Sequence, residues 1–149
     1  MKNKIVFLTL IICMAAAGVL QANNKKANRY FELYRYSKAI PLYKKSLSSR
    51  DEAVKREATI RLGDCYRLIN DPWEAQSWYS RALLFPEPEP MVYFYLGQAL
   101  QRTEQYEEAL TAFRKYDVLN PSDPRGRFQA GGPMTGQVHG LLLLRFMTH

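Results

Sequence analysis

The stretch YFYLGQALQRTEQYEEALTAFRKYDVLNP, residues 93–121, decides the fold. Its small residues Gly97 and Ala109 stand twelve positions apart. Bulky apolar or aromatic side chains surround them at helical spacing, at Tyr93, Leu96, Leu100 and Phe113. Small residues let two helices approach closely, and the bulky ones fill the space beside that contact. The stretch therefore predicts two antiparallel helices joined by a short turn.

The same spacing occurs 34 residues earlier in the chain. The matching packing residues are Gly63, Ala75 and Tyr79 in the earlier copy and Gly97, Ala109 and Phe113 in the later one, which ends at Pro121. This pattern resembles the tetratricopeptide repeat, a helix–turn–helix unit of 34 residues. We therefore expect an all-α solenoid of about three helix pairs, stacked as a right-handed superhelix.

A less regular helix pair precedes these two copies. Ala27 occupies the small position of its first helix, and Ala39 and Tyr43 repeat the pattern of the second helix with a separation of 36 residues. Hydrophobic periodicity and turn signals predict helices over residues 25–33, 36–47, 49–68, 73–85, 91–102 and 104–119. The repeat domain is expected to cover residues 23–123.

The helical period is lost after Pro121, where glycine becomes frequent. Residues 124–149 are therefore expected to form an irregular, Gly-rich tail. Its apolar end, LLLLRFM at residues 141–147, has two interpretations. It either covers the exposed face of the last helix, or it is the abnormal end of a truncated reading frame. The second is favoured because the segment resembles no capping helix.

The chain begins like a secretory leader. Lys2 and Lys4 precede an apolar run, residues 5–17, that is too short to span a bilayer. A basic start, a short apolar run and a small residue at the cut site indicate a signal peptide over residues 1–22, cleaved after Ala22. Cleavage after Ala17 is the second choice. The mature chain would then contain no transmembrane span and would be exported, to the periplasm or the periplasmic face of the outer membrane.

Two alternatives to cleavage remain. The apolar run would have to act as a retained membrane anchor, which its length disfavours. Otherwise Cys13 would have to be a lipid-acceptor cysteine, which the bulky Ile11 and Ile12 before it disfavour. Without Cys13, the mature chain keeps Cys65 alone, so it cannot form an internal disulfide. Cys65 is expected to be a small buried hydrophobe rather than a reactive thiol.

Composition and charge indicate a globular protein without naming its ligand. The chain of 149 residues is 47% hydrophobic and 23% charged, in the ordinary range for a folded domain. Loss of Lys2 and Lys4 with the leader leaves 19 basic and 14 acidic side chains, a net charge of +5. A modest positive field favours anionic partners in general. For an exported protein we expect no nucleic acid.

No catalytic or metal-binding constellation is present in the sequence. Both histidines, His139 and His149, fall in the irregular tail. Glu107 and Glu108 are adjacent on a predicted helix, so they point about 100° apart and cannot act as a carboxylate dyad. There is no phosphate-binding loop and no C-x-x-C pair. The sequence predicts no enzyme, no cofactor and no metal site.

A candidate binding face consists of first-helix side chains that packing does not require. In tetratricopeptide arrays, which this pattern resembles, such positions line a concave groove. The candidates are Asn28, Phe31, Ile60, Asp64, Arg67, Phe94, Gln98, Gln101 and Arg102. Polar side chains around aromatics suit an extended peptide or a partner helix. A merely solvated face explains the same residues, and the sequence leaves both interpretations open.

One combination of segments resembles a narrower family. A leader is followed by KKANRYFELYRYSKAIPLYKKSL, then IRLGDCYRLINDPWEAQSWYSRAL, then FRKYDVLNPSDPRG, within residues 25–127. This is similar to the N-terminal region of OmpA-type outer-membrane proteins of Bacteroidetes, which combine tetratricopeptide repeats, a β-propeller and a peptidoglycan-binding domain; some belong to the type IX secretion machinery. The resemblance implies protein–protein docking in the periplasm, with assembly at the outer membrane possible. The alternative function is an N-terminal, truncated piece of such a cell-envelope tether.

Overall fold

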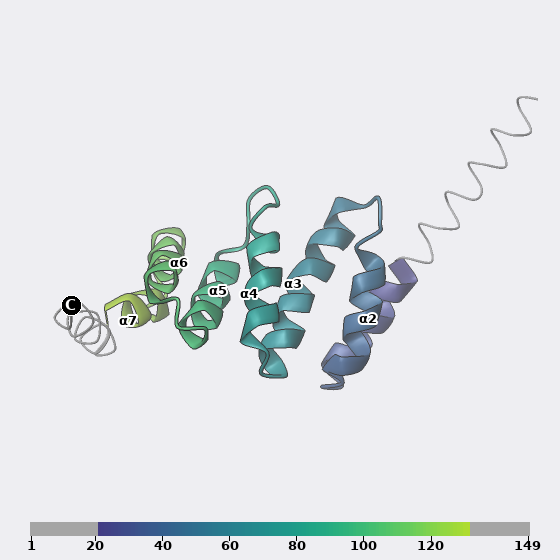
Figure 1. Cartoon of the computed structure of the whole chain (residues 1–149). Coiled ribbons are helices and arrows are strands. Elements are labelled where there is room, and N and C mark those ends of the chain that lie inside the picture. Colours follow the sequence, from purple (N-terminus) through teal and green to yellow (C-terminus); the bar gives the residue numbers. More distant parts are fainter. Residues whose placement is uncertain (1–20, 132–149) are drawn as a thin grey trace, which may run out of the picture. The chain divides into compact units, whose positions relative to one another are not determined.

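The computed structural model describes residues 21–131, and no strand occurs among them (Figure 1). A first helix covers residues 21–32. It is followed by α2 (Tyr36–Ser46), α3 (Glu52–Leu68), α4 (Pro72–Ala82), α5 (Pro90–Arg102), α6 (Tyr106–Leu119) and α7 (Arg125–Gly131). Residues 1–20 of the expected leader and 132–149 of the expected tail lie outside the described range. No helix within that range has the length and apolarity needed to cross a bilayer.

The chain divides into two compact units, of which residues 21–82 and 83–131 are described. We call them the N-terminal and the C-terminal unit. The N-terminal unit contains the first helix and α2 to α4, and α3 packs against both α2 and α4. Its core is built from alanines and larger apolar side chains: Ala27, Ala39, Tyr43, Ala58, Leu62, Cys65 and Trp78.

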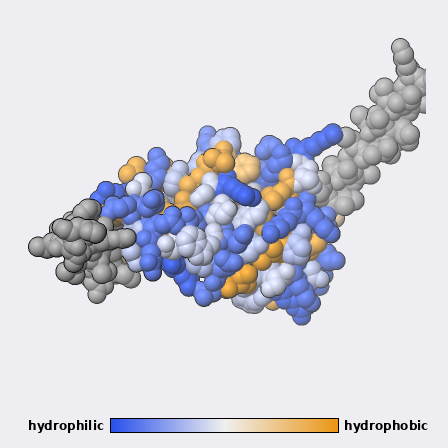
Figure 2. Space-filling model, viewed as in Figure 1, coloured by the Kyte–Doolittle hydropathy of each residue, from blue (hydrophilic) through white to orange (hydrophobic). Residues whose placement is uncertain are grey.

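The C-terminal unit contains α5, α6 and α7, with α6 packed against both of the others. Its buried side chains are Val92, Phe94, Leu96, Ala99, Leu100, Ala109, Ala112, Phe113 and Tyr116. On α6 they recur every three or four residues, as expected for a helix that buries one face, whereas on α5 Val92, Phe94 and Leu96 alternate, so this helix buries more than one side. On the surface drawn in Figure 2, hydrophobic side chains are interspersed among hydrophilic ones.

A glycine lies under an aromatic ring in each unit. A β-carbon on Gly63 would lie 2.6 Å from the ring of Tyr79, and one on Gly97 would lie 2.6 Å from the ring of Phe113. Such a distance is well inside van der Waals contact, so only glycine permits this approach. The alanines of the pattern, Ala75 and Ala109, are buried on the second helix of each pair, and Pro121 directly follows Asn120, the C-cap of α6.

The turn inside each helix pair is built the same way each time. Its left-handed residue is Tyr34 (φ 57°), Asn70 (φ 66°) or Glu104 (φ 62°). The next amide donates to the carbonyl five residues back, from Arg35 to Tyr30 (2.8 Å), from Asp71 to Tyr66 (2.9 Å) and from Gln105 to Leu100 (2.9 Å). This is the backbone pattern of a Schellman motif, which satisfies carbonyls at a helix end. Backbone groups thus turn the chain without requiring glycine.

Eight of the twelve predicted helix limits differ from the structure, by one to four residues; the first helix, for example, begins at residue 21 rather than at residue 25. Three of these differences have a clear local cause. α3 begins at Glu52 rather than at residue 49, because the Asp51 carboxylate caps it by accepting a hydrogen bond of 2.9 Å from the Ala53 amide. α4 ends at Ala82 rather than at residue 85, since Pro86 cannot donate to the Ala82 carbonyl. α6 begins at Tyr106 rather than at residue 104, because the left-handed Glu104 belongs to the preceding turn.

The prediction of an irregular chain from residue 124 is wrong for its first part, because residues 125–131 form α7. The 34-residue spacing continues into this helix: Pro124 follows Pro90, and Phe128 follows Phe94. α7 packs against α6, and a β-carbon on Gly126 would lie 2.8 Å from the Tyr116 ring. The high glycine content after Pro121 suggested a loop, but Gly126 lies in a helix, where it allows close packing against Tyr116.

Candidate functional site

The candidate face of the N-terminal unit is formed by the first helix and α3. It carries five of the residues that the sequence predicted: Asn28, Phe31, Ile60, Asp64 and Arg67. All except Asp64 are partly exposed. Helical spacing places Asn28 and Phe31 on one side of the first helix, and Ile60, Asp64 and Arg67 on one side of α3. These two helices are linked by polar contacts, which form two clusters.

The first cluster joins the two helices through the carboxylate of Glu57. Asn24 donates to it through Nδ2 at 2.5 Å, and Asn28 donates through Nδ2 at 2.8 Å. Asn28 in turn accepts a hydrogen bond of 2.5 Å from the Tyr43 hydroxyl on α2. Burial raises the pKa of Tyr43, so the hydroxyl stays protonated and can donate at neutral pH. Asn28 is therefore held in one orientation from both of its ends.

The second cluster surrounds Asp64, which is 8% exposed. The Tyr79 hydroxyl on α4 donates to its Oδ1 at 2.8 Å, and guanidinium nitrogens of Arg61 and Arg67 lie 3.5 and 3.6 Å from its carboxylate oxygens. Burial, and then the Asp64 charge, raise the pKa of Tyr79. The Arg61 guanidinium also lies 4.8 Å from the ring centroid of Phe31. Asp64 thus connects the helix-pair core to the candidate face.

Cys65 belongs to the core of the N-terminal unit. It is fully buried, and burial followed by the Asp64 charge raises its pKa to about 12. A thiol with this pKa is protonated at neutral pH, whereas the nucleophile in cysteine chemistry is the thiolate. Cys65 therefore acts as a small packed side chain.

The candidate face of the C-terminal unit lies on α5, at Phe94, Gln98, Gln101 and Arg102. Phe94 differs from its expected role, because it is 5% exposed and packs into the core. Its ring centroid lies 5.7 Å from that of Phe113 and 5.2 Å from that of Tyr116. Gln98 and Gln101 are half-buried and Arg102 is exposed. Of these four residues, the three that remain open to a ligand are therefore polar.

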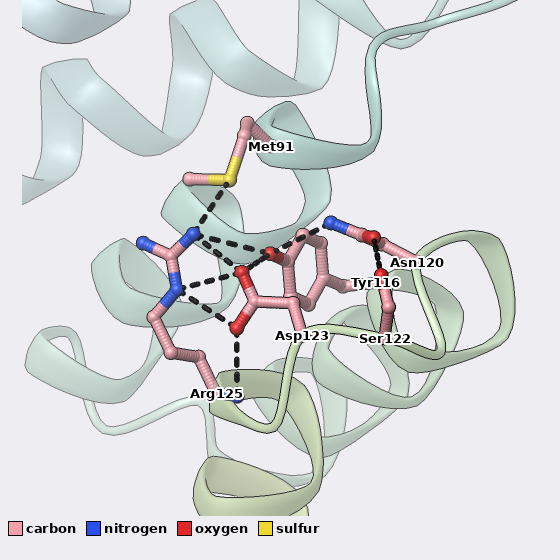
Figure 3. A network of polar contacts seen from close by, with 6 residues as sticks. All are labelled: Met91, Tyr116, Asn120, Ser122, Asp123 and Arg125. Atoms are coloured by element: carbon pink, nitrogen blue, oxygen red, sulfur yellow. Dashed lines mark hydrogen bonds and ion pairs between the residues drawn. The ribbon is translucent and has the colours of Figure 1, made fainter.

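Phe94 is covered by the guanidinium of Arg125 at the start of α7, 5.3 Å from its ring centroid. Arg125 forms an ion pair of 2.5 Å with Asp123, which accepts a hydrogen bond of 2.6 Å from the Tyr116 hydroxyl (Figure 3). Figure 3 also shows Met91, whose sulfur lies 3.6 Å from the same guanidinium. These contacts fasten α7 to α5 and α6.

Three residues of the face were missed by sequence reasoning: Asn24, Glu57 and Arg61. Asn24 precedes Asn28 by four residues, so both lie on one side of the first helix. Glu57 and Arg61 precede Asp64 by seven and three residues, which likewise puts them on its side of α3. Helical spacing from the predicted residues could have identified all three.

Comparison with known proteins supports the fold. Residues 92–123 match the family model of the tetratricopeptide repeat. No curated protein matches the chain in sequence. One similar solved structure is the C-terminal tetratricopeptide domain of a Plasmodium falciparum putative FK506-binding protein. It is 20% identical, with a TM-score of 0.71, over 89% of this chain and 95% of that one.

Two further similar structures contain peptides or partner segments. The first tetratricopeptide domain of Spaghetti (RPAP3), bound to the HSP90 peptide SRMEEVD, is 17% identical, with a TM-score of 0.71, over 82% of this chain and 95% of that one. PcrH in complex with the chaperone-binding region of PopB is 15% identical, with a TM-score of 0.62, over 76% of this chain and 90% of that one. At these identities the likeness shows the fold alone.

The predicted fold class is confirmed: the chain has an all-α fold of tetratricopeptide solenoid type. The expected right-handed superhelix concerns how the two units are arranged, and it stays a prediction.

Proposed function

We propose that this chain is a non-enzymatic interaction scaffold that docks a protein or peptide on its first-helix face. Each unit presents its own part of this face: the side chains of the first helix and α3 in the N-terminal unit, and separately those of α5 in the C-terminal unit. One observation carries the proposal: Ile60, Gln98 and Gln101 stay partly exposed, while the residue that precedes each of them (Thr59, Gly97 and Leu100) is buried. Packing uses one side of each helix, and the other side presents a mixed polar and apolar surface of the kind that peptides bind.

The similar structures support this proposal at the level of the fold. The Spaghetti domain binds a peptide of HSP90, and PcrH binds a segment of PopB. Binding of a peptide or of a partner's segment is therefore compatible with helix pairs of this type.

Photo-crosslinking tests which face is used. A photoreactive phenylalanine analogue placed at Ile60 or Gln98 reports on the first-helix face, and the same residue at Ser80 or Thr111, exposed on α4 and α6, is the matched control. After irradiation in an extract of the source cells, we expect one shared protein adduct from the first two positions. Equal yields of that adduct from Ser80 or Thr111 would place docking elsewhere.

We propose further that the chain is exported and acts in the periplasm or at the periplasmic face of the outer membrane. The basic start and short apolar run of residues 1–22 support this location. N-terminal sequencing of the mature chain from cell fractions tests it, with Asn23 as the expected first residue. Recovery of acylated Cys13 at the N-terminus would instead identify a lipoprotein.

A second candidate function is that of a piece of a cell-envelope tether. The observation that favours it is the resemblance of residues 25–127 to the repeat region of OmpA-type proteins of Bacteroidetes, some of them type IX secretion components. In that case the repeats would dock a partner while other domains bind the cell wall. The coding sequence downstream tests this, since a propeller and a peptidoglycan-binding region there would support a tether.

A further inference from the structure

We propose that Asn24, Asn28 and Glu57 form a subsite for a cationic side chain, a lysine or an arginine, of the docked partner. The inference rests on the proposed docking function and names the chemistry of one position in it. It depends on three observations: the unpaired charge of Glu57, the fixed orientation of two amides, and one buried acceptor that has no donor.

The carboxylate of Glu57 has amide donors but no cation. Asn24 and Asn28 each donate to one of its oxygens. Within residues 21–131, no lysine or arginine lies in ion-pair distance of Glu57. Arg61, one helical turn further along α3, is engaged with Asp64 at 3.5 Å and with the Phe31 ring at 4.8 Å. The amides satisfy hydrogen-bonding capacity, but they leave the negative charge of Glu57 uncompensated.

The Glu57 carboxylate also fixes how both amides point. An ionised carboxylate only accepts hydrogen bonds, so each asparagine must turn its Nδ2 toward Glu57 and its Oδ1 away. The Oδ1 of Asn28 accepts from Tyr43. The Oδ1 of Asn24 has no hydrogen-bond partner, although Asn24 is 5% exposed. A buried acceptor without a donor is unfavourable, and it marks a position where an additional donor would be stabilised.

A cationic donor supplies both a positive charge for Glu57 and a hydrogen bond for the Oδ1 of Asn24. The two atoms of the Asn24 amide group are covalently neighbouring, so a donor at Oδ1 lies beside the carboxylate that Nδ2 contacts. A lysine ammonium has three donors and a positive charge, so it can serve the free oxygen and neutralise Glu57 together. A neutral amide would supply only the donor, and an acidic side chain would be repelled. Glu57 and Asn28 are partly exposed, so the cation approaches the carboxylate from solvent, and its entry has to uncover the buried Asn24 Oδ1.

The arrangement disfavours a metal ion at the same place. Metal ions of the hard type require oxygen ligands, whereas both asparagines present their nitrogen to the carboxylate. The subsite is therefore one for an organic cation rather than for an inorganic one.

Three labelled peptides of one frame, acetyl-Gly-Ser-Leu-X-Phe-Ser-Gly-amide with X as lysine, glutamine or glutamate, test the subsite on the full chain. Binding is measured by fluorescence anisotropy, and the side-chain amide signals of Asn24 and Asn28 are followed by NMR. We expect the lysine peptide to bind about tenfold more tightly than the glutamine peptide, the factor that corresponds to about 1.4 kcal/mol. It should also shift both amide signals.

Glu57→Gln should abolish the preference for lysine, because it removes the charge while keeping the shape. Glu52→Gln is the matched control, since Glu52 is an exposed carboxylate on the same helix that pairs with Lys55. Asn24→Leu is a second variant, which removes the unpaired acceptor together with one amide donor to Glu57; it should weaken lysine binding. Equal binding of the lysine and glutamine peptides, or a lysine preference that survives Glu57→Gln, overturns the subsite.

Failure of the subsite can be told apart from failure of docking. If all three peptides bind equally and adducts still form at Ile60, the subsite is wrong and docking on the first-helix face stands. If no peptide binds and adducts at Ile60 are also absent, both proposals are wrong.

Discussion

The Tyr79 hydroxyl on α4 donates a hydrogen bond of 2.8 Å to the carboxylate of Asp64 on α3, while the Tyr79 ring lies against Gly63. One side chain therefore holds the helix pair together and also fixes a residue of the candidate face. Thirty-four residues later, Phe113 and Gln98 take the places of Tyr79 and Asp64. The α5–α6 pair therefore lacks both the hydroxyl donor and the carboxylate acceptor of this hydrogen bond.

Removal of this hydroxyl by Tyr79→Phe should lower the free energy of unfolding by about 1–3 kcal/mol, because the buried Asp64 carboxylate loses a donor. Urea unfolding followed by circular dichroism measures the change. Tyr106→Phe is the control, since Tyr106 is 37% exposed and should tolerate the loss of its hydroxyl. Equal stability of the Tyr79→Phe variant would mean that water replaces the hydroxyl at Asp64.

Gly97→Leu should force α5 and α6 apart, since even a β-carbon would lie 2.6 Å from the Phe113 ring. Overpacking of this kind costs about 1–3 kcal/mol. Gln98→Leu introduces the same side chain one position further, on the half-exposed side of α5, and is the matched control. The melting temperature should fall for the first variant only. Partial recovery in Gly97→Leu combined with Phe113→Ala would assign the effect to this contact.

Cys65 should make stability depend on pH in the alkaline range. Burial raises its pKa from an ordinary value of 9.0 to about 12, so the folded chain keeps the thiol neutral. The stability that the folded chain gains from keeping this thiol neutral is fully present below pH 9.0. It is lost as pH rises toward about 12, because only the unfolded thiol ionises in that interval. The free energy of unfolding, measured from pH 8 to about 10, should fall as pH rises, and Cys65→Ala should make this fall less steep. An unchanged slope would show that the thiol ionises equally in both states.

Tyr34→Asn should stabilise the chain. Tyr34 has a φ of 57° and is 81% exposed, so its side chain contributes little burial at a backbone conformation that asparagine tolerates better. We expect a gain of about 0.5–1 kcal/mol in the free energy of unfolding. Asn70→Tyr in the next helix pair is the reciprocal test and should destabilise. A loss on Tyr34→Asn would show that the edge contact of this ring with Tyr36, 6.3 Å between centroids, outweighs the backbone cost.

Arg125→Gln should loosen α7, because it removes the ion pair with Asp123 and uncovers the ring of Phe94. Hydrogen exchange of the α7 amides should become faster. Arg127→Gln changes another arginine of α7 and removes its 3.3 Å ion pair with Asp117 on α6; it is the control and should have a smaller effect. Comparable acceleration in both variants would show that general charge loss, rather than contact with Phe94, governs the helix.

The sequence was sufficient for the helix pairs, because the repeat period directly encodes which residues meet, as at Gly63 and Tyr79. It was insufficient where contacts depend on chain segments outside the period. Phe94 and Ile60 occupy equivalent positions, yet Phe94 is buried, with its ring in contact with Phe113 and Tyr116 and beneath the Arg125 guanidinium. The link between Asn24 and Glu57 was missed because helical spacing can place each residue on a face but does not show which side chains of two helices form a hydrogen bond. α7 was missed because glycine usually marks loops, whereas Gly126 is needed for contact with Tyr116.

The repeated turn has a consequence for engineering. Twelve residues separate the small positions within each pair, at Ala27 and Ala39, Gly63 and Ala75, and Gly97 and Ala109. Between pairs the separation is 24 residues from Ala39 to Gly63 but 22 from Ala75 to Gly97. The turn within a pair has the same length and the same closing hydrogen bond in all three pairs, whereas the connections between pairs differ by two residues. A tag or a sensor domain should therefore be inserted beside Ser48 or Glu87, where added chain leaves every helix pair intact.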